Sequence, residues 1–306
     1  MSLDITTEFM KCIICNSEKH NLSFENIKDL EYLTYEPVNY VTCSSCGLVF
    51  QNPLPKETLI PAFYPENYRN YLPLKNGFFS KLKNIQFKKQ AKKISNYFSK
   101  NDKFLEIGFG NGGLLLALKN MGYESLYGID FNDKNFSKLK EKGIKLAVAN
   151  IENDFPLSGK FDVIFMNNVI EHFLNPIKVL ENCKNHLSEN GKIILITPNS
   201  SALEFSIFKK YWAGFHAPRH TFIFNEKNIK ELANKLKLSS VEVLPECDPG
   251  QWSISIQNTF QDSKITKTRL KNGMAWYTVP LSMICAPVAT LQNVIGRSTS
   301  MMCVLG

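Results

Sequence analysis

Several features are missing from this chain of 306 residues. It has no uninterrupted apolar run of about eighteen residues, which is the length that a membrane-spanning helix needs. Residues 1–11 carry Asp4 and Glu8 and no apolar stretch, so we expect no secretory signal and a cytoplasmic protein. Hydrophobic residues make up 44% and charged residues 21%, and this ordinary globular balance excludes wholesale disorder.

Acidic residues are also missing from one segment of the chain. Residues 75–100 contain eight lysines and no acid, within a chain whose net charge is +8. Apolar residues recur there near helical spacing, which predicts an amphipathic helix with a basic outer face. They are Phe78, Leu82, Ile85, Ile94 and Phe98. The basic face is either simply solvated or a patch for an anionic substrate or nucleic acid.

Four of the eight cysteines form two close pairs, Cys12 with Cys15 and Cys43 with Cys46. Each pair has a two-residue gap, which lets both thiolates of a tight turn face one ion. Two such turns predict a four-sulfur cage for a structural zinc ion, although iron also suits four thiolates. A redox pair or plain core cysteines are the alternatives. The 27 residues between the pairs indicate a small subdomain between the two turns.

The chain changes character near residue 75. We expect residues 1–74, which are rich in Pro and Tyr, to form a zinc-binding module with a loop-rich exit. From residue 103 onward, short apolar strands alternate with helices, which predicts an α/β domain over 75–306 with a parallel sheet and helices on both faces. The expected strands are 103–107, 125–129, 144–149, 161–167, 192–197 and 241–243. The expected helices are 112–121, 132–142, 176–187 and 226–237.

The tail over residues 273–306 contains a single charge, Arg297. Pro280 and Pro287 are expected to break it, so it is not expected to span a bilayer. We expect it to pack on the sheet, with residues 301–305 as a final edge strand.

The glycine loop FLEIGFGNGG, residues 104–113, follows a strand and opens a helix. Glycines there allow a tight turn and a close approach of the backbone to a ligand. Asp130 ends the next strand, where a carboxylate can accept both hydroxyls of a ribose. Gly108, Gly110 and Gly113 also fit the G-x-G-x-x-G spacing of nicotinamide-binding folds. Glu106 at the strand end favours instead a ligand with an ammonium group and no pyrophosphate.

Two later segments complete a recognisable order of motifs: FDVIFMNNVIEH at 161–172 and GKIILITPN at 191–199. With these, residues 104 to about 243 resemble class I S-adenosylmethionine-dependent methyltransferases. The run CGLVFQNPLP at 46–55 and HAPRH at 216–220 resemble the branch with an N-terminal zinc-binding module. That branch includes sugar C-methyltransferases acting on nucleotide-linked deoxysugars, and many members come from polysaccharide gene clusters. The resemblance implies a Rossmann-like seven-stranded sheet.

The resemblance also assigns roles to residues around the cofactor. The methionine end of S-adenosylmethionine would lie against Glu106, Gly108, Gly110 and Gly112. Asp130 would hold the ribose, and Phe131, Asn150 and Ile151 would lie against the adenine. Asn167 is a further cofactor-binding candidate. A carboxylate that only caps loop amides is the alternative for Glu106, and a helix N-cap is the alternative for Asp130.

Methyl transfer to a weakly acidic acceptor needs a base. His172 is the first candidate because it follows a strand at the ligand-binding edge. Its sequence neighbour Glu171 and the more distant His220 are further catalytic candidates. His172 alternatively braces its loop. His216, Arg219 and His220 lie in an expected substrate lid, residues 198–225, and suit an anionic or sugar-bearing substrate. A lid that only packs on the cofactor domain is the other interpretation.

We therefore expect a methyltransferase acting on a small molecule, such as a sugar or nucleotide-linked sugar, at carbon or oxygen, in polysaccharide or secondary-metabolite biosynthesis. An RNA methyltransferase that uses the zinc module and the basic helix for binding is the main alternative, although a nucleic-acid partner is not expected. A non-enzymatic scaffold and a nicotinamide-dependent reductase are further alternatives. The sequence does not indicate an oligomeric state.

Overall fold

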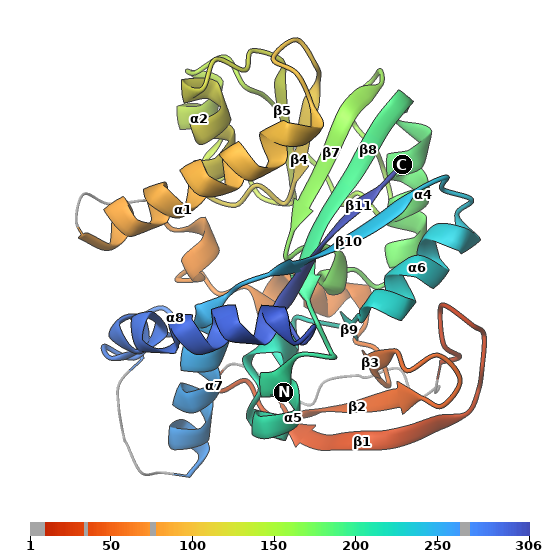
Figure 1. Ribbon diagram of the computed structural model, residues 1–306, viewed down its shortest axis with the longest axis vertical. Helices are drawn as coiled ribbons and strands as arrows, with labels where there is room; N and C mark the ends of the chain where they lie inside the picture. Colours follow the sequence, from red (N-terminus) through yellow and green to blue (C-terminus); the bar gives the residue numbers. More distant parts are fainter. Residues whose placement is uncertain (1–9, 34–35, 74–77, 264–269) are drawn as a thin grey trace.

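The computed structural model describes residues 10–33, 36–73, 78–263 and 270–306. Two sheets organise these residues, and they lie one above the other in Figure 1. The larger has seven strands in the order β10-β11-β8-β7-β4-β5-β6, and the smaller has four in the order β1-β2-β3-β9. The predicted α/β architecture with a seven-stranded Rossmann-like sheet is confirmed.

Five strands of the large sheet run parallel, as predicted. They are β4 (Phe104–Ile107), β5 (Leu126–Asp130), β6 (Lys145–Val148), β7 (Phe161–Asn167) and β8 (Leu187–Pro198). Two further strands, β11 (Ser300–Leu305) and β10 (Val241–Glu246), extend this sheet antiparallel beyond β8. The central strands β4, β5 and β7 end side by side, with Ile107 paired to both Ile129 and Met166. Their carboxyl ends therefore meet at one edge, where parallel sheets bind ligands.

Side chains alternate between the two faces of the sheet, and each face is covered by helices. In β4, Leu105 and Ile107 face the core shared with α4 (Pro176–Asn185) and α6 (Glu226–Lys235). Phe104 faces the opposite core. That second core is covered by α1 (Phe78–Ile94), α2 (Gly113–Asn120) and α3 (Phe136–Lys140). Burial on both faces explains why the strands are nearly continuous apolar runs.

The remaining helices lie toward the small sheet (Figure 1). They are α5 (Leu203–Phe208), α7 (Pro249–Asp262) and α8 (Thr278–Val294). Short 3-10 helices cover Glu57–Phe63, Arg69–Tyr71, Ser95–Tyr97, Ile170–His172, Lys209–Tyr211 and Ala213–Phe215. Among the residues that the structure describes, no helix has both the length and the apolar character needed to cross a bilayer.

Three expectations about local structure were wrong. The last strand, β11, is not at the edge, because β10 pairs with its outer side. The tail forms one continuous helix, α8, which includes both Pro280 and Pro287. Pro280 lies in its first turn, where a missing N–H costs nothing. Ile85, expected on the apolar face of α1, is exposed.

The small sheet contains strands from both sides of the expected domain boundary after residue 74. Its strands β1 (His20–Ile27), β2 (Val38–Cys43) and β3 (Val49–Gln51) come from the N-terminal segment. The fourth, β9 (Phe222–Ile223), comes from the segment 198–225 and pairs antiparallel with β3. The N-terminal segment and the expected lid therefore form one sheet, and this sheet places the lid residues beside the N-terminal turns.

Candidate active site

A cavity of about 520 Å³ lies at the carboxyl ends of β4, β5 and β7. Its volume lies in the usual range for small-molecule sites. Most of the residues that the sequence assigns to a cofactor line it: Glu106, Gly108, Gly110, Asp130, Phe131, Asn150, Ile151 and Asn167. His172 lines it as well. Gly112 does not line it and lies instead against Leu139 of α3.

The glycine loop leaves no room for side chains on its cavity side. Gly108 has a φ of 74°, and a Cβ there would approach a methyl carbon of Val169 to 2.5 Å. Gly110 has a φ of 54°, and its Cβ would lie 2.8 Å from the carbonyl oxygen of Asn70. Both positions require glycine because L-residues rarely adopt these backbone angles. The loop thus exposes backbone to the cavity.

Two carboxyl groups, Glu106 and Asp130, face the cavity without a cationic partner among the described residues. Burial, and then the nearby Asp130, raise the pKa of Glu106 well above its usual range. Its Oε2 atom is buried and has no hydrogen-bond partner. Burial also raises the pKa of Asp130 to about 6, although backbone N–H groups of Gly110 and Asn132 donate to it. This pair suits a ligand that brings positive charge and hydroxyl donors.

The segment 57–71 covers the cavity, and the sequence analysis did not identify its residues as part of the site. Tyr64 and Tyr71 pack on Phe131, with ring centroids 5.1 and 5.6 Å away. Glu57 accepts hydrogen bonds from the side-chain amides of Asn150 and Asn153. The density of Tyr and Pro before residue 74 was the available signal, but no local pattern indicates where this segment folds back.

Glu171, His172 and His220 come together beside the cavity. One ligating atom of each lies within 4.8 Å of the others. Nδ1 of His172 lies 3.0 Å from the hydroxyl of Tyr64 and 3.1 Å from the carbonyl oxygen of Arg219. Burial lowers the pKa of His172 to about 3, so the ring is neutral at neutral pH and a weaker base than an exposed histidine. Only His172 of the three lines the cavity.

Of the expected substrate residues, Arg219 is buried and His216 is half-buried, and neither lines the cavity. Nη2 of Arg219 lies 2.7 Å from Oδ2 of Asp29, and the side chain is 1% exposed. Nδ1 of His216 lies 2.6 Å from Oε1 of Glu31, while burial lowers the pKa of this histidine. In this structure both residues join the expected lid to the turn at 29–31.

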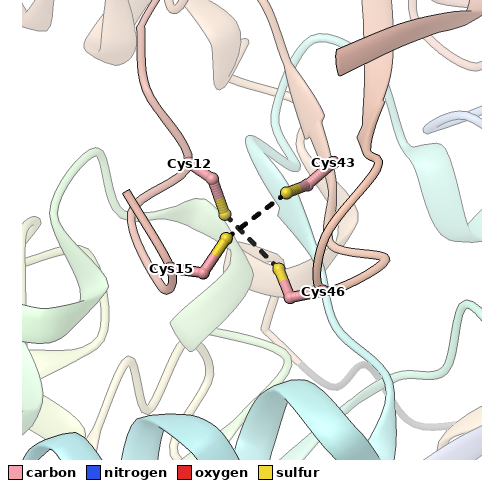
Figure 2. Close-up of side chains that lie close together, drawn as sticks. All are labelled: Cys12, Cys15, Cys43 and Cys46. Atoms are coloured by element: carbon pink, nitrogen blue, oxygen red, sulfur yellow. Dashed lines mark hydrogen bonds between the residues drawn. The ribbon is translucent and has the colours of Figure 1, made fainter. Parts of the chain in front are cut away.

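The two cysteine pairs meet in one cluster, with the four sulfur atoms turned toward one another (Figure 2). Sγ of Cys12 lies 3.5 Å from Sγ of Cys46, and Sγ of Cys15 lies 3.5 Å from Sγ of Cys43. Zinc–sulfur bonds of about 2.3 Å in a tetrahedron put sulfurs roughly 3.8 Å apart, so these distances fit a zinc ion. Asn228 of α6 donates a hydrogen bond to the carbonyl oxygen of Cys46. The cluster therefore packs directly on the α/β domain.

Comparison with known proteins gives one family match. Residues 82–243, more than half of the chain, match the model of a methyltransferase domain. A tRNA U34 carboxymethyltransferase of Campylobacter hominis is 29% identical over 101 residues, 31% of this chain and 35% of that protein. A ribosomal protein L11 methyltransferase of Lactobacillus johnsonii is 33% identical over 29% of each chain. The chain thus spans only about a third of the length of these two relatives.

Solved structures with a similar arrangement are more distant in sequence. A SAM-dependent methyltransferase from Archaeoglobus fulgidus is 17% identical, with a TM-score of 0.48 over 72% of this chain and 93% of that one. Magnesium protoporphyrin IX methyltransferase from Synechocystis, solved with bound SAH, is 16% identical, with a TM-score of 0.45 over 61% and 92% of the two chains.

Proposed function

The chain belongs to the methyltransferase domain family, and from this premise we propose that it is an S-adenosylmethionine-dependent methyltransferase. The observation that carries the proposal is the cavity at the ends of β4, β5 and β7. It has a narrow glycine loop and two carboxyl groups that find no cationic partner in the described part of the chain. The unpartnered Oε2 of Glu106 suits the ammonium group of this cofactor, and Asp130 suits its ribose hydroxyls. When bound, the cofactor supplies a methyl group on an activated sulfonium.

The protein's own contribution is to position the acceptor and to manage a proton. The acceptor would enter between the glycine loop and His172, under Tyr64 and Tyr68, all of which line the cavity. A weakly acidic acceptor would lose its proton to the group of Glu171, His172 and His220. Of these three residues, His172 is the one that lines the cavity. Closure by the segment 57–71 would exclude water.

We further propose that the acceptor is a small molecule, such as a sugar or a nucleotide-linked sugar, methylated at carbon or oxygen. The support is the resemblance to the zinc-module branch, together with the fit of the four cysteines to a structural zinc ion. In this proposal residues 1–74 form the zinc-binding module and residues 198–225 form the lid. Arg219 and His216 contact the carboxyl groups of Asp29 and Glu31. The lid would therefore affect acceptor binding through its packing against the rest of the protein, and not through direct contacts of these two side chains.

An RNA acceptor is the second candidate, and the tRNA-modifying relatives favour it. Exposed lysines on α1, such as Lys88, Lys89 and Lys92, offer a basic face. RNA binding through this face should weaken steeply as salt is raised. The double variant Lys88→Gln/Lys92→Gln should weaken it further, and affinity for a nucleotide-linked sugar should not change. Absent or salt-insensitive RNA binding removes this candidate.

Isothermal titration with S-adenosylhomocysteine tests the proposed cofactor. We expect micromolar binding to the full chain, weakened by Glu106→Gln and unchanged by Glu124→Gln, an exposed carboxyl far from the cavity wall. A folded protein that shows no binding refutes the proposal. His172→Gln should keep this affinity and lower methyl transfer, and unchanged turnover would place the base elsewhere.

A further inference from the structure

The group of Glu171, His172 and His220 contains an acceptor that the surrounding protein leaves unused. Glu171 is fully buried, and Oγ1 of Thr197 donates to its Oε2 over 3.0 Å. The other oxygen, Oε1, has no hydrogen-bond partner and lies 3.9 Å from Nε2 of His220. That separation is too long for a hydrogen bond. A buried carboxyl oxygen without a hydrogen-bond partner is costly, and a bound cation would satisfy it.

The orientation of His220 points to the same conclusion. Its Nδ1 lies 2.7 Å from the carbonyl oxygen of Gly214, so this nitrogen carries the proton and donates. The opposite nitrogen, Nε2, is then unprotonated and faces Glu171. A ligating histidine in proteins characteristically donates its other N–H to a backbone carbonyl in this way, which fixes the ring.

His172 supplies the third donor. Its Nδ1 also lies within hydrogen-bonding distance of a backbone carbonyl, that of Arg219 at 3.1 Å. The rings of His172 and His220 are nearly perpendicular, with centroids 4.5 Å apart. The guanidinium of Arg219, whose carbonyl oxygen His172 contacts, is paired with Asp29 at 2.7 Å.

We propose that Glu171, His172 and His220 bind one divalent transition-metal ion, separate from the four-cysteine cluster. Two imidazoles and one carboxylate form a donor set that suits zinc or ferrous iron. Small side-chain shifts would bring the three ligating atoms, now within 4.8 Å of one another, to bonding distance. Three protein ligands leave further coordination positions open, and His172 lies at the cavity wall.

The existence of this site goes beyond the proposed function, but its role rests on it. With the ion bound, the three side chains would serve as ligands in place of the base proposed above. An acceptor hydroxyl on a divalent cation becomes more acidic and would release its proton to solvent before methyl transfer to oxygen. Thr197 and Gly214 would act as positioning groups through the ligands that they hold.

Metal content of the full chain after saturation with zinc and removal of excess ion tests the proposal. We expect two zinc ions per chain, and one in Glu171→Gln and in His220→Gln. The pair Cys12→Ser/Cys46→Ser should also lose one ion, from the other site. His186→Gln is the matched control, because this histidine stacks on Phe155 outside the cluster and should keep two ions.

Loading the wild-type protein with cobalt gives a second readout, which does not depend on whether any variant folds. Wild-type protein loaded with cobalt should show a weak d–d spectrum of a nitrogen–oxygen site beside the intense thiolate bands of the cysteine cluster. The proposal is overturned if the metal content of a folded Glu171→Gln protein equals that of the wild type, or if thiolate-bound cobalt accounts for all of the bound ion. Titration of S-adenosylhomocysteine on the same samples separates this failure from failure of the proposed function. Cofactor binding without the second metal ion leaves the methyltransferase proposal standing.

Discussion

The cavity at the ends of β4, β5 and β7 and the loop at residues 216–220 differ in how far their buried polar side chains are hydrogen-bonded. In the cavity, Glu106 presents a buried oxygen without a partner. In the loop, Arg219 donates to Asp29, to the carbonyl oxygen of Phe63 and to that of Ala217. A buried polar group without a hydrogen-bond partner is available to a ligand, whereas one whose hydrogen bonds are all made within the protein stabilises the fold. From this difference we expect Glu106 to contact the cofactor and Arg219 to stabilise the fold.

The largest expected effect comes from the structural side of this comparison. Arg219→Met removes the guanidinium that pairs with the buried carboxylate of Asp29, so the free energy of unfolding should fall by about 3–5 kcal/mol. Denaturant unfolding monitored by circular dichroism measures this. Lys227→Met, which breaks only the exposed pair with Glu231, should change stability little. If Arg219 instead contacts substrate, its variant will keep its stability and raise KM.

Asp130→Asn tests the binding side. It removes the charge that would hold the ribose hydroxyls and keeps one amide oxygen to accept from the Gly110 backbone. Affinity for S-adenosylhomocysteine should fall roughly 10- to 100-fold, about 1.5–3 kcal/mol. Isothermal titration measures it, with the exposed Asp133→Asn as the matched variant. Equal affinities in the two variants would mean that Asp130 only caps its loop.

Gly110→Ala should act through both backbone angle and contact. Its Cβ would lie 2.8 Å from the carbonyl oxygen of Asn70, so the loop or the covering segment must shift. We expect a loss of about tenfold in cofactor affinity. Gly296 has a similar φ of +70°, but a Cβ added there would have no atom within 4 Å. Gly296→Ala should therefore leave cofactor affinity unchanged. Parallel titrations decide whether the close approach matters beyond backbone strain.

The smallest effect is a pH dependence of cofactor affinity. Burial holds the pKa of Asp130 near 6, and ribose hydroxyls donate to the charged form. The contribution of Asp130 to affinity should therefore be complete above pH 7, and affinity should fall about tenfold per unit as the pH drops below 6. Asp130→Asn should flatten this profile. A wild-type affinity that stays constant between pH 5 and 7 would contradict the assignment.

The sequence predicted the structure best where the information is local. The run from β4 through the glycine loop combines an apolar strand, glycines and a helix start, and each is set by neighbouring residues. Its place at the cavity follows from the parallel arrangement of β4, β5 and β7. The two-residue gap within each cysteine pair is also a local signal, and from it we predicted the cluster that Cys12, Cys15, Cys43 and Cys46 form.

Prediction from the sequence failed where a partner lies far along the chain. The antiparallel pairing of β10 with β11 joins segments about sixty residues apart, and no local pattern indicates it. Arg219 and Asp29 are separated by 190 residues, so the sequence could not distinguish a substrate ligand from a buried ion pair. Tyr64 was missed for the same reason, because it reaches His172 across 108 residues.

A crystal structure of the full chain with S-adenosylhomocysteine tests the central claim most directly. We expect the ligand in the cavity at the ends of β4, β5 and β7, with its ribose on Asp130 and its ammonium group near Glu106. A ligand bound elsewhere, or a cavity that stays empty at saturating concentration, would contradict the account.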